Sequence, residues 1–308
     1  MDAAITRSDL AEMAAACDLD GVGAAPARPV PVDAGVAARL AARMPPELGY
    51  FARSLDRRLD PSLVLPGVRS VIAGFVAYAG ASAGLEAMPP GGACVSRFAW
   101  CRDYHDTVGA RFARLAASIE ARGGRGRWHV DTGPVLEKAW AAAAGLGFVG
   151  RNTLLVTPRF GSFVFLGVVL TDLDVEPSAP VPDGCGSCSA CRDACPTGAL
   201  GEERVLDASR CLAHLTVTAR GPFPAELASS LRGHLYGCDV CQDACPWNRR
   251  AERPDRPEFR PLAGLHYPAA AEVATMDDEA FDRLFGPTPA RRRGADGVRE
   301  IARMLTRV

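Results

Sequence analysis

The sequence lacks three features that would indicate a membrane, secreted or generally nucleic-acid-binding protein. No stretch approaches the roughly 20 uninterrupted apolar residues that cross a bilayer. Asp2, Asp9 and Glu12 interrupt the apolar segment that a secretory signal needs near the N-terminus. The net charge is only −1, so no overall basic field attracts nucleic acid, and such binding must use local patches. We therefore expect a cytoplasmic protein that does not enter a membrane.

Lysine is also nearly absent, whereas cysteine is abundant. Lys138 is the only lysine, and this bias towards arginine indicates genome composition rather than function. The chain has 11 cysteines. In the cytosol these side chains remain thiols rather than disulfides. So many free thiols in one chain indicate that it binds metal.

Patterns of apolar residues divide the chain into three expected domains. Up to residue 174, apolar runs with the length of buried strands alternate with helical patterns, which indicates a mixed α/β (α+β) domain over residues 1–174. A linker rich in Pro and Asp then leads to a cysteine-dense domain over 175–250 and to a short helical extension over 251–308. The expected strands are 68–79, 154–156 and 163–170, and the expected helices are 8–20, 106–122, 134–144 and the stretch from 270 onwards.

The cysteines of the second domain follow the spacing of bacterial ferredoxins. Residues 185–196 read C-x2-C-x2-C-x3-C-P, in which three cysteines bind one [4Fe–4S] cluster and the fourth reaches a second cluster. Residues 238–246 repeat C-x2-C-x3-C-P and supply three more thiolates. Two clusters need eight, and Cys211 is the spare cysteine that lies between the two blocks. The predicted ligand sets are Cys185, Cys188, Cys191 and Cys245 for one cluster, and Cys195, Cys211, Cys238 and Cys241 for the other.

Zinc is the alternative for these cysteines, because C-x2-C pairs also bind tetrahedral zinc. A zinc ribbon needs only four ligands and rarely shows C-x3-C-P twice, so the pattern favours a ferredoxin-like module with two clusters. Clusters only carry electrons. The chemistry must therefore be located elsewhere in the chain.

Six further motifs resemble the epoxyqueuosine reductase family, and the similarity extends from about residue 48 to about residue 248. The first is DTGPVLEKAW at 131–140, which begins with an acidic residue. The others are AGLGFVGRNT at 144–153, GSFVFLG at 161–167, WCRDYHD at 100–106, RCLAHLT at 210–216 and LYGCDVCQDACPWN at 235–248.

This resemblance implies a particular enzyme. Its members reduce epoxyqueuosine to queuosine at the wobble position of a tRNA anticodon, the last step of queuosine biosynthesis. It implies cobalamin, as cob(II)alamin, and two [4Fe–4S] clusters as cofactors. It also implies that the first domain is a cobalamin-binding catalytic domain whose core is similar to those of nitroreductases and reductive dehalogenases.

The reaction needs a proton donor, because removing the epoxide oxygen consumes electrons and protons and develops an alkoxide. The resemblance favours Asp131 for this role, with a carboxyl pKa raised by burial. Spacing alone favours Asp131 as a cap of the helix expected near Pro134, and both roles can coexist. His105 and His214 lack the surrounding motif of an axial cobalt ligand, and we expect structural roles for both.

The resemblance also implies further contacts with cobalamin. Arg58, in a stretch over 57–61 that we interpret as a loop, matches a family arginine, although by itself it would be interpreted as solvated. Leu155 and Leu166 would lie against the corrin ring while also serving as core residues of their strands. The predicted cobalamin contacts are Arg58, Ser96, Asp131, Leu155, Leu166 and Thr216.

The implied partners are a tRNA and an electron donor. The tRNA would present an anticodon loop that carries epoxyqueuosine, and arginine suits such a loop because it pairs with phosphate and stacks on unpaired bases. Arg97 and the pair at 249–250 lie next to family motifs and are the candidates for this contact. The electron donor would be a flavodoxin or ferredoxin system. Nothing in the sequence requires more than a monomer.

Two other kinds of function stay open. A reductive dehalogenase-like enzyme, or a paralogue with another substrate, would use the same cofactors. A plain electron carrier would use the clusters alone, and its first domain would only dock a partner. Bound corrinoid would exclude the carrier, and turnover of epoxyqueuosine rather than of an organohalide would separate the two enzymes.

Overall fold

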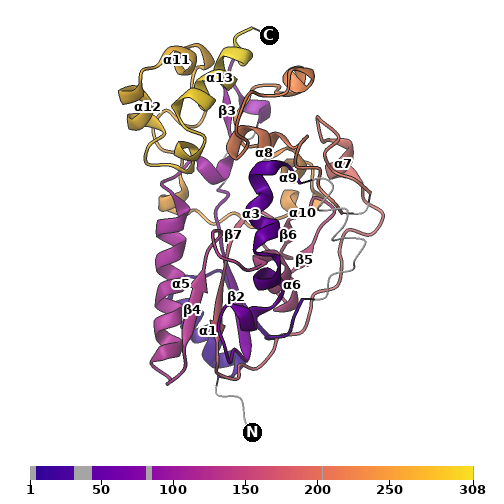
Figure 1. The fold of residues 1–308 in the computed structure, drawn as a ribbon, viewed down its shortest axis with the longest axis vertical. Coiled ribbons are helices and arrows are strands. Elements are labelled where there is room, and N and C mark those ends of the chain that lie inside the picture. Colours follow the sequence, from indigo (N-terminus) through magenta and orange to yellow (C-terminus); the bar gives the residue numbers. More distant parts are fainter. Residues whose placement is uncertain (1–4, 31–43, 81–84, 203, 308) are drawn as a thin grey trace.

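The structure, a computed structural model, describes residues 5–30, 44–80, 85–202 and 204–307. A sheet with its covering helices occupies one end of the molecule, and the C-terminal helices occupy the other (Figure 1). The N-terminal stretch in which Asp2, Asp9 and Glu12 argue against a secretory signal lies partly outside the described residues. None of the helices in the described ranges is long and apolar enough to span a bilayer.

A four-stranded antiparallel sheet forms the centre of the first domain. All eight residues of its second strand are buried, because helices cover both faces of the sheet, and this explains why the sequence shows a continuous apolar run rather than alternation. The strands predicted at 68–79 and 163–170 are confirmed. The mixed α/β class takes its α+β form because every strand pair of this four-stranded sheet is antiparallel. The strand order is β1 (Gly21–Pro26), β2 (Ser70–Ala77), β7 (Val164–Thr171) and β4 (Gly126–His129).

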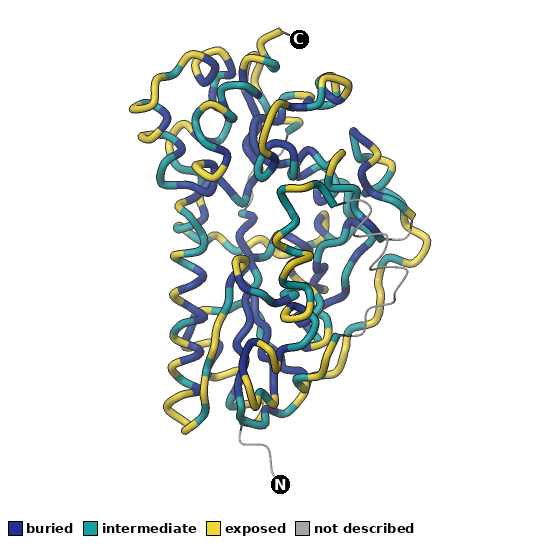
Figure 2. The backbone as a smooth tube through the Cα atoms, in the orientation of Figure 1, coloured by how far each residue is buried: buried dark blue, intermediate teal, exposed yellow. Residues whose placement is uncertain are grey.

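Helices pack on both faces of this sheet, and Figure 2 shows its strands as the most buried part of this end of the molecule. On one face, α1 (Arg7–Ala16) and α5 (Tyr104–Glu120) share an apolar cluster with β2 and β7. On the other face, α6 (Glu137–Ala143) packs through Trp140 against the remaining side chains of the same strands. The helix expected at 106–122 is confirmed, and the one expected at 8–20 is present but ends at Ala16. The helix expected from 134 begins instead at Glu137.

Two glycines that are paired on neighbouring strands make room for an aromatic ring of α5. Gly74 of β2 pairs with Gly167 of β7. A β-carbon built at Gly167 would lie only 2.5 Å from Cε2 of Phe112, and one at Gly74 would lie 3.2 Å from Cζ of the same ring. The fully buried Phe112 ring therefore lies directly against the backbone of the two central strands.

Replacing Gly167 by alanine is expected to lower the free energy of unfolding by about 1–3 kcal/mol, because the Phe112 ring must move in a close-packed core. Chemical denaturation measures this change. Gly49→Ala is the matched control, since its new methyl group would meet only the flexible end of Arg53. Equal stability of the two variants would show that the core can absorb the extra methyl group.

A second apolar core joins the cysteine-rich segment to the C-terminal helices. It combines side chains from 93–100, from 212–236 and from 262–302. It therefore draws on all three expected domains, and the division at 174 and 250 stays a prediction. The helical C-terminal part is confirmed. The elements of this end are β3 (Cys94–Val95) paired in parallel with β8 (His234–Tyr236), α8 (Leu212–Val217), α11 (Ala270–Thr275), α12 (Asp278–Leu284) and α13 (Ala295–Leu305).

Short elements connect the two cores. The stretch over 57–61 that we interpreted as a loop is partly helical, because α4 ends only at Leu59. The short strands β5 (Phe148–Val149) and β6 (Leu155–Val156) pair antiparallel. The short helices are α3 (Gly49–Arg53), α4 (Leu55–Leu59), α7 (Ala190–Asp193), α9 (Val240–Asp243) and α10 (Pro246–Arg249). The 3-10 turns are Pro46–Leu48, Pro61–Leu63, Leu85–Ala87, Arg97–Ala99, Ala225–Ser230, Pro257–Phe259 and Pro289–Arg292.

Candidate active site

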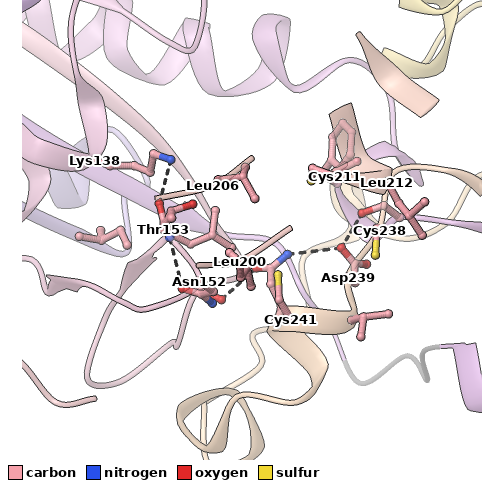
Figure 3. Close-up of a pocket in the computed structure, with 18 of the residues that line it drawn as sticks. Lys138, Asn152, Thr153, Leu200, Leu206, Cys211, Leu212, Cys238, Asp239 and Cys241 are labelled. Atoms are coloured by element: carbon pink, nitrogen blue, oxygen red, sulfur yellow. Dashed lines mark hydrogen bonds between the residues drawn. The ribbon is translucent and has the colours of Figure 1, made fainter. Parts of the chain in front are cut away.

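A cavity of about 430 Å³ lies between the sheet domain and the cysteine-rich segment. Its volume lies within the range typical of ligand pockets, and its walls are mostly apolar. In Figure 3, Lys138 and Thr153 lie on one side and Cys211 and Cys238 on the other. Leucines lie between the two sides. The apolar lining includes Leu155, Leu166, Leu200, Leu206 and Leu212.

The structure brings together four of the six residues predicted to contact cobalamin. Ser96, Asp131, Leu155 and Leu166 all line the cavity, whereas Arg58 and Thr216 are not in its lining. The fully buried Thr216 hydroxyl donates to the Leu212 carbonyl at 2.7 Å and accepts from the Gly237 N–H at 2.9 Å. Thr216 thus holds the turn that precedes Cys238. The direct cofactor contacts stay predictions.

Asp131 lies in the loop between β4 and α6. Its side chain lies within hydrogen-bond distance of two residues at the start of α5. Asp131 has a left-handed backbone with φ of 58°, which Asp tolerates better than most side chains. Its Oδ2 accepts a hydrogen bond from the Tyr104 hydroxyl at 3.0 Å and lies 3.2 Å from Nε2 of His105. Nδ1 of His105 lies 2.6 Å from Oδ1 of Asp103. The imidazole therefore bridges two carboxylates.

These contacts set the charge of Asp131. Burial raises the pKa of its carboxyl, but the hydrogen bond and charge of His105, together with the Tyr104 hydroxyl, outweigh burial and lower it overall. The hydrogen bond to Asp131 in turn raises the pKa of His105, against the effect of burial. The expectation of a raised Asp131 pKa is therefore wrong for this conformation. In the pair, the shared proton lies on the imidazole.

The capping interpretation of Asp131 is also wrong. Helix α6 begins at Glu137 with Leu136 at its N-cap, and no side chain caps it. The Asp131 carboxylate instead points to Tyr104 and His105.

Arg58 holds the loop that contains Asp131 through hydrogen bonds to its backbone. Its side chain is buried, so the interpretation as a solvated arginine is wrong. Nη1 donates to the carbonyls of Gly133 at 3.2 Å and Val135 at 3.4 Å. The guanidinium also lies over the ring of Phe51, 4.7 Å from its centroid. Arg58 therefore fixes the backbone immediately after Asp131.

Arg58→Ala is expected to lower the free energy of unfolding by about 1–3 kcal/mol, because it leaves two carbonyls without their donor. Backbone amides of residues 131–136 should exchange with solvent faster than in the wild type, which hydrogen exchange measures by mass spectrometry. Arg57→Ala is the control, since Arg57 is the exposed neighbour of Arg58. Unchanged exchange in the loop would show that Arg58 does not hold it.

Sequence reasoning missed two side chains of the cavity, Glu137 and Lys138. Burial raises the pKa of Glu137 to about 7, and the charge of Asp131 adds to this while Arg58 and Lys138 oppose it. Nζ of Lys138 donates to the carbonyl of Thr153 at 2.8 Å, and burial lowers the pKa of this ammonium. Two signals could have found them: both belong to the motif at 131–140, and Lys138 is the only lysine.

The two predicted cysteine sets each surround one cavity. Cys195, Cys211, Cys238 and Cys241 line the cavity that contains Asp131. A smaller cavity of about 170 Å³ is lined by Cys185, Cys188, Cys191 and Cys245. Among the described residues, no three His, Cys, Asp or Glu side chains converge so closely that they could hold a single metal ion. The assignment of each cysteine to a cluster stays a prediction.

The repeated C-x3-C-P stretches explain how one segment serves both cavities. Helices α7 and α9 each carry the next-to-last cysteine of a block, at Cys191 and Cys241. Both helices end two residues before the last cysteine of the block. That cysteine precedes a proline, which disfavours helix, and Cys245 is accordingly extended. The chain therefore turns between the last two cysteines of each block, so Cys195 lies at a different cavity from Cys191, and Cys245 at a different cavity from Cys241.

The structure does not support Arg97 as an RNA contact. Its side chain is buried, and Nη1 lies 3.2 Å from Asp239 and 2.8 Å from Asp243. Ser96 donates to the same Asp239 at 2.5 Å, so the turn after β3 is fastened to the second cysteine block. Arg97 is therefore a buried structural partner of the cysteine-rich segment, whereas the pair at 249–250 is exposed.

Comparisons with known proteins agree on one family. The family model "Epoxyqueuosine reductase QueG, DUF1730" matches residues 58–132, and "4Fe-4S double cluster binding domain" matches 184–248. An epoxyqueuosine reductase from Gloeobacter violaceus is 46% identical over 254 residues, which cover 80% of this chain and 79% of the relative. One from Cellulophaga algicola is 35% identical and covers 82% of both chains.

Solved structures lead to the same family. An epoxyqueuosine reductase with an epoxyqueuosine-modified stem loop of tyrosine tRNA is 30% identical, with a TM-score of 0.84 over 97% of this chain and 80% of that chain. The Bacillus subtilis enzyme, described with its catalytic aspartate loop swung out of the active site, is 29% identical with the same TM-score and coverage. By its sequence and its fold, the chain belongs to the epoxyqueuosine reductase family.

Proposed function

We propose that this chain is an oxidoreductase that reduces epoxyqueuosine to queuosine at the wobble position of a tRNA anticodon, the last step of queuosine biosynthesis. The observation that carries the proposal is that one cavity is lined both by acids that can donate a proton, Asp131 and Glu137, and by four cysteines. The relative bound to an epoxyqueuosine-modified stem loop supports the substrate. We further propose that the protein acts as a monomer in the cytoplasm, where cysteines stay reduced.

The residues of the cavity fit cobalamin. Leu155 and Leu166 offer an apolar wall for a flat ring, and Ser96 and Asp131 lie in the same lining. Asn152 Nδ2 is buried and has no hydrogen-bond partner among the described residues. Buried polar atoms rarely stay unpaired, and an amide carbonyl at the edge of a corrin ring could accept from it. When bound, cobalamin would supply a low-valent cobalt that acts as nucleophile or reductant towards the strained epoxide.

The two cysteine sets suit two [4Fe–4S] clusters that pass electrons one at a time. Cys195, Cys211, Cys238 and Cys241 would hold the cluster beside the substrate cavity. In the other set Cys188 is exposed, and Arg151 and Arg250 line the same smaller cavity. Electrons from a flavodoxin or ferredoxin system would therefore enter near Cys188, where arginines suit an acidic donor.

Asp131 would give a proton to the epoxide oxygen, and His105 would supply that proton. In the described conformation Asp131 is the ionised member of the pair, so it must first take the proton from Nε2 of His105. Tyr104 and Asp103 orient the two side chains for this transfer. Arg58 supports the loop backbone, and the swung-out loop of the Bacillus subtilis relative suggests that this loop opens to admit the substrate.

Mass spectrometry of a modified anticodon stem loop tests the proposal. The protein is reconstituted anaerobically with iron, sulfide and cobalamin, and is given a chemical reductant. Loss of one oxygen atom from epoxyqueuosine is the expected result. Dehalogenation of an organohalide without change in the stem loop would favour a dehalogenase-like enzyme. Clusters without bound corrinoid would favour an electron carrier.

A further inference from the structure

We infer that Glu137 donates the second proton of the reaction, the one that leaves with the epoxide oxygen as water. This inference rests on the proposed function. The reduction breaks both carbon–oxygen bonds of the epoxide, forms a carbon–carbon double bond and releases water. It consumes two electrons, which the clusters pass on from the external donor, and two protons. A single carboxyl group carries one proton at a time. Asp131 alone therefore supplies only one of the two protons that each reaction consumes.

The position of Glu137 suits this role. It is the first residue of α6 and lines the same cavity as Asp131. The charged groups that act on it are Asp131, Arg58 and Lys138. Lys138, its neighbour, donates instead to the carbonyl of Thr153. Glu137 is thus a second acid in the cavity that contains Asp131.

The surroundings of Glu137 favour its protonated form. Its Oε1 is buried and has no hydrogen-bond partner in the part of the chain that the structure describes. Burying an unpaired charged oxygen is costly, and protonation removes much of this cost. The hydroxyl of the acid would then be free to donate to a ligand in the cavity.

Asp131 and Glu137 differ in their protonation, whereas the third acid of the lining, Asp239, is paired with Ser96 and Arg97. Burial raises the pKa of Glu137 to about 7, whereas His105 and Tyr104 overcome burial at Asp131 and lower its pKa. Near neutral pH a large fraction of Glu137 therefore carries a proton while Asp131 is ionised. Above pH 7, Glu137 loses its proton and the rate should fall.

Glu137→Gln tests the inference, because glutamine keeps the size and the hydrogen-bonding capacity but cannot give up a proton in this step. With the fully loaded protein, we expect the turnover number to fall about 10²-fold. The part of the decline above pH 7 that is due to Glu137 should disappear, so that only the loss of the His105 proton still slows the variant at high pH. Glu137→Asp, which keeps the acid, should recover part of the rate. Glu272→Gln, on the exposed surface of α11, is the matched control and should behave as wild type.

Infrared spectroscopy gives a readout that does not depend on turnover. The resting wild-type protein should show a protonated-carboxyl band that titrates near pH 7 and that is missing from Glu137→Gln. Wild-type turnover and an unaltered pH profile in the variant would overturn the inference, as would the absence of the band between pH 5 and pH 7. A wild-type protein that leaves epoxyqueuosine unchanged would overturn the proposed function and this role with it.

Discussion

Replacing Cys211 by alanine is expected to remove one of the two clusters and to abolish turnover of epoxyqueuosine. The iron content should fall from about eight to about four atoms per chain, because each cubane needs four thiolates. Cys211 precedes α8 and lines the cavity together with Cys195, Cys238 and Cys241. None of the other three spare cysteines, Cys17, Cys94 and Cys101, is in that lining, so no substitute ligand is at hand.

Iron and sulfide analysis, together with electron paramagnetic resonance of the reduced protein, measures this result. Cys17→Ala is the control, because Cys17 is buried in the core beside the sheet and lies outside both cysteine-lined cavities. It should keep both clusters and full turnover. Two intact clusters in Cys211→Ala would refute the assignment, and bound zinc in the wild type would revive the zinc-ribbon alternative.

The sequence predicts best those features that depend on neighbours along the chain. The apolar runs at β2 and β7 identify buried strands, since continuous burial needs no knowledge of the partner strand. The two cysteine sets are likewise predictable, because the C-x3-C-P spacing fixes where the chain turns between clusters. The cavities gather the seven cysteines of the two blocks accordingly, and Cys211, which lies outside both blocks, lines the larger cavity with Cys195, Cys238 and Cys241.

What the sequence could not predict depends on contacts between distant segments. Arg97 looked like a candidate for RNA binding because the acids that bury it, Asp239 and Asp243, follow more than 140 residues later. Arg58 looked like a solvated arginine because the carbonyls of Gly133 and Val135 that accept its hydrogen bonds belong to another loop. In each case the role of a charged side chain was predicted wrongly, because the sequence does not show which distant residues contact it.

The same limit explains the error in the charge of Asp131. Burial alone raises the pKa of a carboxyl, and the motif gave no sign of the opposing groups. Tyr104 and His105 lie 27 and 26 residues earlier in the sequence and reach Asp131 only because α5 packs beside β4. The motif identified the residue, but only the fold brings His105 and Tyr104 to the carboxylate, where they lower the pKa of Asp131.

Asp131→Asn is expected to lower the turnover of epoxyqueuosine by about 10²–10⁴-fold, while iron, sulfide and cobalamin content stay at wild-type levels. Asparagine tolerates the left-handed backbone at this position and can still accept the hydrogen bond from Tyr104, so the loop should keep its shape. It cannot pass a proton from His105 to the substrate oxygen. Loss of the Asp131 charge should also lower the pKa of His105 relative to wild type, since the hydrogen bond to Asp131 is the main cause of its elevation.

Single-turnover assays on the modified stem loop measure the first effect, and histidine resonances followed by NMR across pH measure the second. Asp106→Asn is the control, because Asp106 is an exposed acid in the first turn of α5 and is not in the cavity lining. The two readouts separate the possible roles of Asp131. A lowered His105 pKa with near wild-type turnover would make Asp131 a structural partner of the imidazole. Another group of the cavity lining, with Glu137 as the candidate, would then have to provide both protons. A large loss of turnover with intact cofactors would leave proton transfer through Asp131 as the step that the substitution removed.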